Sequence, residues 1–175
     1  VEGKTFEMLT REVFALLERA DTRRLIVDLR RNGGGSNFFG EALRKGIGRA
    51  HVNRPGGLYV LIGSRTFSAA QNLASRLERE TFATFVGEPT GGAPNHHGDA
   101  KVATGAATGL TVMVSTLPWF DSYPQDQRPW IFPDLLVPET FADWQAGRDQ
   151  VLAAAVEHRT GIAADELASD RIFYF

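Results

Sequence analysis

The sequence predicts an α/β domain in which helices flank a mostly parallel sheet. Three short, nearly continuous apolar runs are typical of strands buried on both faces. These runs span residues 25–29, 58–62 and 82–86. Apolar residues recur at helical spacing before and between the runs, in segments 5–20, 37–49 and 68–80. Helices and apolar strands that alternate this closely indicate parallel βαβ units with right-handed crossovers.

The pattern changes after Gly87, where glycine and proline dominate the next loop. Residues 101–103 and 110–115 predict a hairpin that turns around 105–109. The stretch 117–133 is rich in Pro, Trp and Asp and is long for a connection, which favours a functional loop. The remaining predicted elements are a short strand at 135–137 and helices over about 141–158 and 163–168.

Composition and charge limit the classes of protein to which the chain can belong. A chain of 175 residues has room for one ordinary domain. Its net charge of −2, with Lys and Arg scattered, predicts no nucleic-acid partner. No apolar run approaches the roughly 20 residues of a membrane-spanning helix. The lack of cysteine excludes disulfides, thiolate metal sites and a cysteine nucleophile.

A run of three glycines follows the first predicted strand, in Asn32–Gly35. Consecutive glycines permit positive φ angles and let a substrate approach the backbone closely. Ser36 is predicted to N-cap the following helix, whose free amides point toward the strand end. Such amides bind an anion or a developing oxyanion. The alternative interpretation is a tight strand-to-helix turn.

Ser68 lies between the second predicted strand and the helix that follows it. A serine there sits at the carboxyl end of the sheet, where ligands bind in open α/β folds. Its hydroxyl and the amide of Ala69 would lie at a helix N-terminus, which favours developing negative charge. The alternative is that Ser68 or Thr66 merely N-caps the helix. Because the Gly87–Gly92 loop follows the third strand at the same edge, the three loops predict one cleft.

Three motifs in this order resemble the tail-specific, or C-terminal-processing, serine peptidase superfamily, which includes tricorn-type peptidases and interphotoreceptor retinoid-binding protein modules. The motifs are Val27–Gly35 (VDLRRNGGG), Thr66–Gln71 (TFSAAQ) and Gly87–Gly92 (GEPTGG). Pro133–Asp134 and the Leu-Leu-Val after them resemble the family's later Pro-Asp strand. The likeness thus runs from about residue 25 to 137.

The resemblance implies a ClpP/crotonase-like core of stacked β-β-α units, and Ser68 matches the family nucleophile. It implies an oxyanion hole formed by an amide of Gly33 or Gly34 together with that of Ala69. The predicted contacts to substrate in the next loop are Gly91, Gly92 and His96. The expected reaction is hydrolysis of a polypeptide substrate through an acyl-enzyme, with no cofactor and no metal ion.

The chain departs from the tail-specific pattern at the general base. The lysine expected after the GEPT sequence is replaced by Ala93. The lysines of the chain lie elsewhere, at positions 4, 45 and 101. Loops ending in Gly-Gly resemble the tricorn or retinoid-binding branch, and tricorn-type sites take a histidine base from an earlier segment. We therefore expect residues 1–175 to form one domain that lacks the N-terminal part of the whole protein and has little peptidase activity alone.

Other polar groups are candidates for the site. Asp126 in the long loop, or Asp121, is the predicted downstream carboxylate of a tricorn-type site. His96 and His97 follow the Gly-Gly pair, beside the predicted cleft. A base must come within about 3 Å of the Ser68 hydroxyl, directly or through water. A polar loop role and a metal site are the alternatives for the two histidines.

Two functions compete with the peptidase hypothesis. A non-catalytic module on the same scaffold would bind peptides or a lipophilic ligand, and the lost lysine motivates it. The aromatic residues of 117–133 are expected to pack against the sheet or, alternatively, to form an apolar substrate wall. A crotonase-like enzyme acting on acyl thioesters is the weaker alternative, because the Ser68 and GEPTGG motifs argue against it.

Overall fold

A parallel sheet occupies the centre of the computed structural model, which describes residues 5–158 and 171–174. Its strand order is β6-β3-β2-β1-β7, and each neighbouring pair runs parallel. The strands are β1 (Leu25–Asp28), β2 (Leu58–Ile62), β3 (Thr84–Gly87), β6 (Leu135–Leu136) and β7 (Arg171–Tyr174). The predicted α/β class with a mostly parallel sheet is confirmed, whereas β7 has no counterpart in the prediction.

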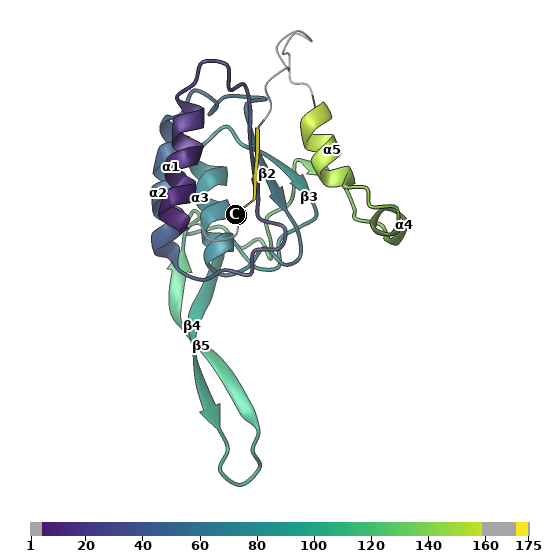
Figure 1. Ribbon diagram of the computed structural model, residues 1–175. Coiled ribbons are helices and arrows are strands. Elements are labelled where there is room, and N and C mark those ends of the chain that lie inside the picture. Colours follow the sequence, from purple (N-terminus) through teal and green to yellow (C-terminus); the bar gives the residue numbers. More distant parts are fainter. Residues whose placement is uncertain (1–4, 159–170, 175) are drawn as a thin grey trace.

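Helices lie on both sides of the sheet (Figure 1). One side is covered by α1 (Phe6–Leu17), α2 (Asn37–Arg49) and α3 (Ala69–Glu80). The other side carries α5 (Gln150–Glu157), with α4 (Phe141–Gln145) next to it. As predicted, the Ser36 hydroxyl caps α2 by accepting a hydrogen bond from the Phe38 amide at 3.3 Å. None of the helices in the described ranges is both long and apolar enough to cross a bilayer.

The sheet separates two apolar cores, because successive side chains of a strand point to opposite faces. The core under the three-helix side contains Val27, Val60 and Phe85, and the core under α5 contains Ile26, Tyr59 and Leu61. Buried Arg24 fixes α5 in place through Nη1, which donates to the carbonyl oxygens of Ala155 at 2.6 Å and Val156 at 2.7 Å. These carbonyls belong to the helix C-terminus, where the backbone lacks intrahelical donors.

The second half of the chain differs from the prediction in two places. The helix expected over 141–158 is two helices, because Gly147 between them has a left-handed φ of 65°. The hairpin strands are longer than predicted, so His96 and His97 lie in a strand and not in a loop. The helix expected at 163–168 lies outside the described residues.

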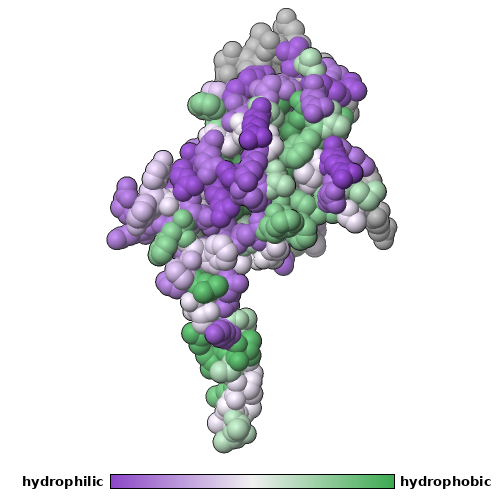
Figure 2. Space-filling model, turned by 90° about the vertical axis from the view of Figure 1, so that its left-hand side faces the viewer, coloured by the Kyte–Doolittle hydropathy of each residue, from purple (hydrophilic) through white to green (hydrophobic). Residues whose placement is uncertain are grey.

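An antiparallel arm formed by β4 (Asn95–Thr104) and β5 (Thr111–Phe120) projects from the body (Figure 1). Its strands pair mainly with each other. Apolar side chains lie along it in the open (Figure 2), and 70% of the Met113 surface is exposed. From Val102 to Leu117 the arm carries no charged residue. It therefore contributes little to the two cores described above.

Candidate active site

Three loops meet at the carboxyl ends of β1, β2 and β3, as the sequence predicted from the parallel strands. The amide of Phe67 donates to the carbonyl of Asn32 at 3.2 Å, which ties the second loop to the first. The amide of Gly91 donates to the carbonyl of Thr66 at 3.0 Å, which ties the third loop to the second. Backbone hydrogen bonds therefore hold the three loops side by side: the glycine run, the Ser68 segment and the GEPTGG loop.

Thr66 fixes the course of the Ser68 segment. Its fully buried hydroxyl donates to the carbonyl of Leu29 at 2.8 Å and accepts from the amide of Gly63 at 3.1 Å. Both partners are backbone groups at the ends of neighbouring strands. The Leu29 carbonyl also accepts from the Asn32 amide at 3.1 Å, whereas the Thr66 hydroxyl is the acceptor found for the Gly63 amide among the described residues. Thr66 therefore supports the loop and does not cap α3.

Ser68 adopts a strained backbone at the strand-to-helix turn. Its φ of 54° and ψ of −124° lie where non-glycine residues are rarely found. It occupies the N-cap position of α3, yet its side chain makes no capping hydrogen bond. The alternative interpretation, that this hydroxyl serves to cap the helix, is therefore not what the structure shows. A half-buried hydroxyl is held instead at the start of the helix by a conformation that costs energy.

The glycine run approaches Ser68 more closely than any residue with a side chain could. A Cβ added at Gly34 would lie 2.6 Å from the Ser68 Cβ and 2.9 Å from the Ala69 amide nitrogen. The amide of Gly34 already donates to the Asn32 side chain at 3.0 Å. For the amides of Gly33 and Ala69, no acceptor is found among the residues that the structure describes. Gly33 and Ala69 are thus the predicted donors that remain open.

The third loop packs against the residue that precedes Ser68. A Cβ at Gly91 would overlap the carbonyl oxygen of Ser64, and one at Gly92 would lie 3.2 Å from the Phe67 ring. His96 stacks on the same ring, with centroids 6.4 Å apart, and its Nδ1 contacts the carbonyl oxygen of Ala93 at 3.1 Å. Gly91, Gly92 and His96 therefore lie next to the Ser68 segment, on the Phe67 side.

The structure does not bring Asp126 to Ser68. The Asp126 carboxylate accepts hydrogen bonds from Arg128, and Arg128 also pairs with Glu78 at 2.8 Å. Glu78 lies near the far end of α3, roughly 15 Å along the helix from Ser68. Hydrogen bonds from Arg128 hold the pKa of Asp126 well below its usual range, so this carboxylate stays ionised. Asp126 positions Arg128, and the pairing of Arg128 with Glu78 joins the 117–133 segment to α3.

Asp121 also faces α3 and accepts a hydrogen bond from Arg76 Nε at 2.6 Å. Its Oδ2 is buried and has no partner in the part of the chain that the structure describes. The same holds for both polar atoms of the Gln71 side chain, which is fully buried beside Gly92.

Neither lysine of the described residues lies near Ser68 as a candidate base, since Lys45 pairs with Glu41 at 3.1 Å and Lys101 lies in the arm.

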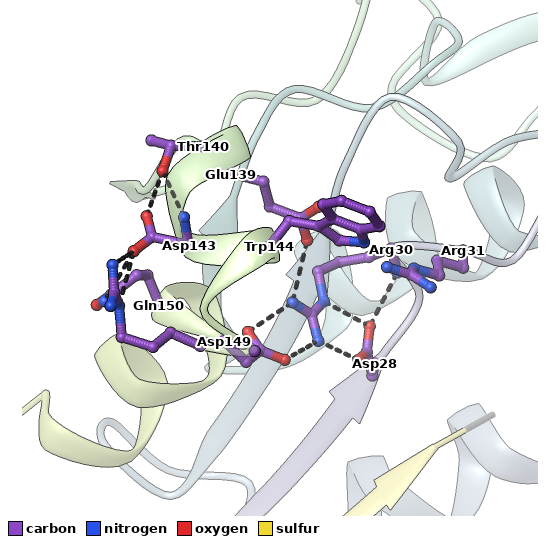
Figure 3. Close-up of a pocket in the computed structure, with 11 residues that line it drawn as sticks. Asp28, Arg30, Arg31, Glu139, Thr140, Asp143, Trp144, Asp149 and Gln150 are labelled. Carbon is purple, nitrogen blue, oxygen red and sulfur yellow. Dashed lines mark hydrogen bonds and ion pairs between the residues drawn. The ribbon is translucent and has the colours of Figure 1, made fainter.

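A hollow of about 590 Å³ lies on the α5 side of the sheet, near the carboxyl end of β1 (Figure 3). At its centre, Arg30 donates to the carboxylates of Asp28 at 2.6 Å, Asp149 at 2.8 Å and Glu139 at 3.3 Å. Burial alone would lower the pKa of Arg30, but its hydrogen bonds to Asp28 and Asp149 raise it overall. Because this guanidinium is saturated by the chain's own carboxylates, it holds α5 to the sheet and is not open to an anion.

Sequence reasoning missed an apolar hollow beside Ser68, on the three-helix side. Its walls include Phe6 from α1, Phe39 from α2 and Leu73 from α3. A signal was present in the sequence, because two consecutive phenylalanines, Phe38 and Phe39, lie three and four residues after the glycine run, at the start of α2. Within the described residues, no group of three or more His, Asp or Glu side chains is placed to hold a metal ion.

Known proteins resemble the chain over a region that includes Ser68 and the GEPTGG loop. The model of peptidase family S41 matches residues 40–134, which is more than half of the chain. The chain therefore belongs to peptidase family S41, which confirms the resemblance to tail-specific peptidases predicted from the motifs. A search of curated proteins finds no match.

Solved structures share the fold. The photosystem II D1 C-terminal processing protease aligns with a TM-score of 0.53 and 20% identity, over 78% of this chain and 40% of that one. A Bacteroides fragilis NCTC 9343 protein assigned to the S41 proteases aligns with a TM-score of 0.54 and 14% identity, over 96% of this chain and 48% of that one. The chain spans less than half the length of each of these structures.

Proposed function

We propose that this chain is the nucleophile-bearing part of a serine peptidase, which hydrolyses peptide bonds through an acyl-enzyme on Ser68. The observation that carries the proposal is the strained Ser68 backbone at the N-terminus of α3, with Gly34 packed against it and no cap on the helix. Strain of this kind persists only where the surrounding structure enforces it, and it is concentrated at functional sites. Thr66 and the two neighbouring loops supply that enforcement.

The chemistry follows from what surrounds the hydroxyl. As the Ser68 Oγ forms a bond to the peptide carbonyl carbon, its proton passes to a base and the carbonyl oxygen gains negative charge. The open amides of Ala69 and Gly33 are the donors that would stabilise that charge. The C–N bond then breaks, the amine leaves with the proton from the base, and water hydrolyses the resulting ester.

The base in this proposal is the imidazole of a histidine supplied from outside residues 1–175. Ala93 replaces the expected lysine, and Lys45 is engaged by Glu41. His96 stacks on Phe67, one residue from the nucleophile, and is proposed to contact the substrate. The purified 175-residue chain should accordingly hydrolyse an unstructured polypeptide far more slowly than the full-length gene product.

A fluorophosphonate probe tests the nucleophile directly. The probe should label the full-length gene product at Ser68, as mapped by mass spectrometry of the labelled peptide, and Ser68→Ala should abolish labelling. Ser64→Ala is the matched control, because Ser64 is exposed in the same loop and should leave labelling unchanged. Labelling that survives Ser68→Ala would defeat the assignment.

The alternative function is a module that binds peptides or a lipophilic ligand without hydrolysing them. It is favoured by the lack of a lysine base at the family position. It predicts that the full-length gene product binds such ligands and leaves an unstructured polypeptide intact. Turnover of that polypeptide, lost in Ser68→Ala, would rule the alternative out.

A further inference from the structure

The apolar hollow beside Ser68 has the size of one side chain, about 180 Å³. Gly34 and Ala69 line it; Ala69 follows Ser68 in the chain, and Gly34 packs against Ser68. A peptide carbonyl whose oxygen rests on the Ala69 amide carries its own side chain only two bonds away from the reacting carbon. That side chain would therefore meet this hollow first.

The lining explains which side chains can enter. The walls are Phe6, Phe39, Leu43 and Leu73, and the polar lining groups, Asn32 and Ser36, already bond to backbone amides. Among the described residues, none of those that line the hollow is charged. Burying a charge without a partner is costly, so an acidic or basic side chain is disfavoured there.

Aromatic rings at the rim of the hollow keep part of their surface in water. The Phe6 and Phe39 rings pack together with centroids 5.0 Å apart, and Phe39 keeps 48% of its surface exposed. Phe38 adds an edge-to-face contact at 5.9 Å and is 81% exposed. Aromatic surface left in water next to an apolar hollow is typical of a binding surface.

We propose that this hollow is the specificity subsite for the residue on the acyl side of the scissile bond, and that it selects one uncharged apolar side chain of about leucine size. The inference rests on the proposed function, since it needs acyl transfer to Ser68. Gly40 sets the depth of the subsite, because it lines the hollow and a Cβ added there would lie 3.8 Å from Leu73, in ordinary contact.

A series of diphenyl aminoalkylphosphonates that differ only in side chain tests the subsite in the full-length gene product. In the labelling step Ser68 Oγ bonds to phosphorus, phenoxide leaves with the electrons of the P–O bond, and the hydroxyl proton passes to the base. The labelling rate, followed by intact mass, should be at least about 10-fold higher for the leucine analogue than for the alanine analogue. The glutamate and lysine analogues should be slowest.

Two variant pairs locate the preference. Gly40→Ala should lower the leucine-to-alanine rate ratio about 10-fold by filling the subsite. Gly48→Ala, on the same helix with open space around it, should leave the ratio unchanged. Phe39→Ala opens one wall and should raise the rate for analogues bulkier than leucine. Phe38→Ala removes the neighbouring ring, which does not line the hollow. This variant should leave the rate for the bulkier analogues unchanged.

The outcomes separate the inference from the function on which it rests. Fluorophosphonate labelling of Ser68 with equal phosphonate rates for all side chains, or with a charged side chain fastest, overturns the subsite and leaves the peptidase intact. A leucine preference that Gly40→Ala and Phe39→Ala both fail to change also overturns it. If neither probe class labels Ser68, the proposed function fails and the subsite falls with it.

Discussion

The segment that carries Ser68 and the β4–β5 arm both lie at the surface, but they are held in opposite ways. The Ser68 segment is bonded to the two loops beside it through Thr66, Phe67 and Gly91, and glycines fill the places where a side chain would not fit. The arm has two long strands that pair with each other and leave both apolar faces in water. The first segment is thus fixed by its neighbours, and the second only by itself.

The difference shows which parts of the molecule can store strain. Ser68 and Asp99 have nearly the same positive φ, 54° and 53°. At Asp99, in the arm, the residue type itself tolerates this angle, and the Trp119 indole donates to its carboxylate at 2.8 Å. At Ser68 no local side-chain bond compensates, so the surrounding loops must supply the energy. Substitutions that loosen those loops should therefore act far more strongly than substitutions in the arm.

The largest effect is expected for Gly34→Ala. The added Cβ would push on the Ser68 Cβ and the Ala69 amide, and the φ of 106° at Gly34 is unfavourable for alanine. A displacement of about 1 Å at a reacting group costs on the order of 100-fold in rate, so fluorophosphonate labelling should fall by about that factor.

Gly35→Ala is the matched control for this prediction. Gly35 also has a positive φ, 137°, but a Cβ there would meet no atom within 4 Å. An equal loss of labelling in both variants would show that backbone strain in the run matters and that the contact with Ser68 does not.

Thr66→Val should produce the next largest effect, on stability. Valine keeps the shape but leaves the buried Gly63 amide without its acceptor, whereas the Leu29 carbonyl still accepts from the Asn32 amide, so the expected cost is roughly 1–3 kcal/mol in unfolding free energy. The change is measured by urea unfolding. Thr111→Val breaks the exposed hydroxyl pair with Thr104 in the arm and should change stability by less than about 0.5 kcal/mol. Similar losses of unfolding free energy in Thr66→Val and Thr111→Val would contradict the difference proposed between the Ser68 segment and the arm.

Acid should weaken the body through Glu41, which joins α2 to α3 by accepting from Arg76 at 3.0 Å. Hydrogen bonds from Arg44, and then from Lys45, lower the pKa of Glu41 to about 2. A carboxylate with a lowered folded-state pKa adds stability above its unfolded pKa of about 4.3, and this stability is lost as pH falls toward 2.

Urea unfolding at about pH 7 and about pH 3 measures this loss. Glu41→Gln should lose less stability than the wild type between the two conditions. Asp99→Asn in the arm, for whose carboxyl the structure gives no coupling to the body, should lose as much as the wild type. The hypothesis fails if Glu41→Gln and the wild type lose equal amounts.

The features predicted best from the sequence are those that continuous apolar runs and glycines determine. The central strands, α2 and the gathering of three loops at one edge follow from β1, β2 and β3 being buried on both faces. β7 escaped prediction because its pairing with β1 joins opposite ends of the chain, and no local pattern encodes such a contact. The arm strands were predicted too short, since both of their faces are exposed and the expected apolar–polar alternation is absent.

In the site, residue types were easier to predict than partners. The Ser68 segment and the glycine run lie together, but the hydrogen bond from the Gly34 amide to Asn32 depends on one side-chain rotamer. The pairing of Asp126 with Arg128 likewise competes with every other cation within reach. A carboxylate in a long loop has several equally plausible partners in the sequence, and only the packing of that loop on α3 selects one.

The smallest effect is expected when the arm is shortened. Ala100 and Ser115 face each other across the hairpin, so residues 101–114 can be replaced by Asn-Gly, which closes a two-residue turn between paired strands. Because the removed residues pack mainly on each other, the unfolding free energy of the body should change by less than about 0.5 kcal/mol. Light scattering should show less self-association than in the wild type, since an exposed apolar ribbon with free edges promotes it. If shortening the arm lowers the unfolding free energy by more than about 2 kcal/mol, the arm unfolds cooperatively with the body. The arm and the Ser68 segment would then differ in exposure but not in their contribution to stability.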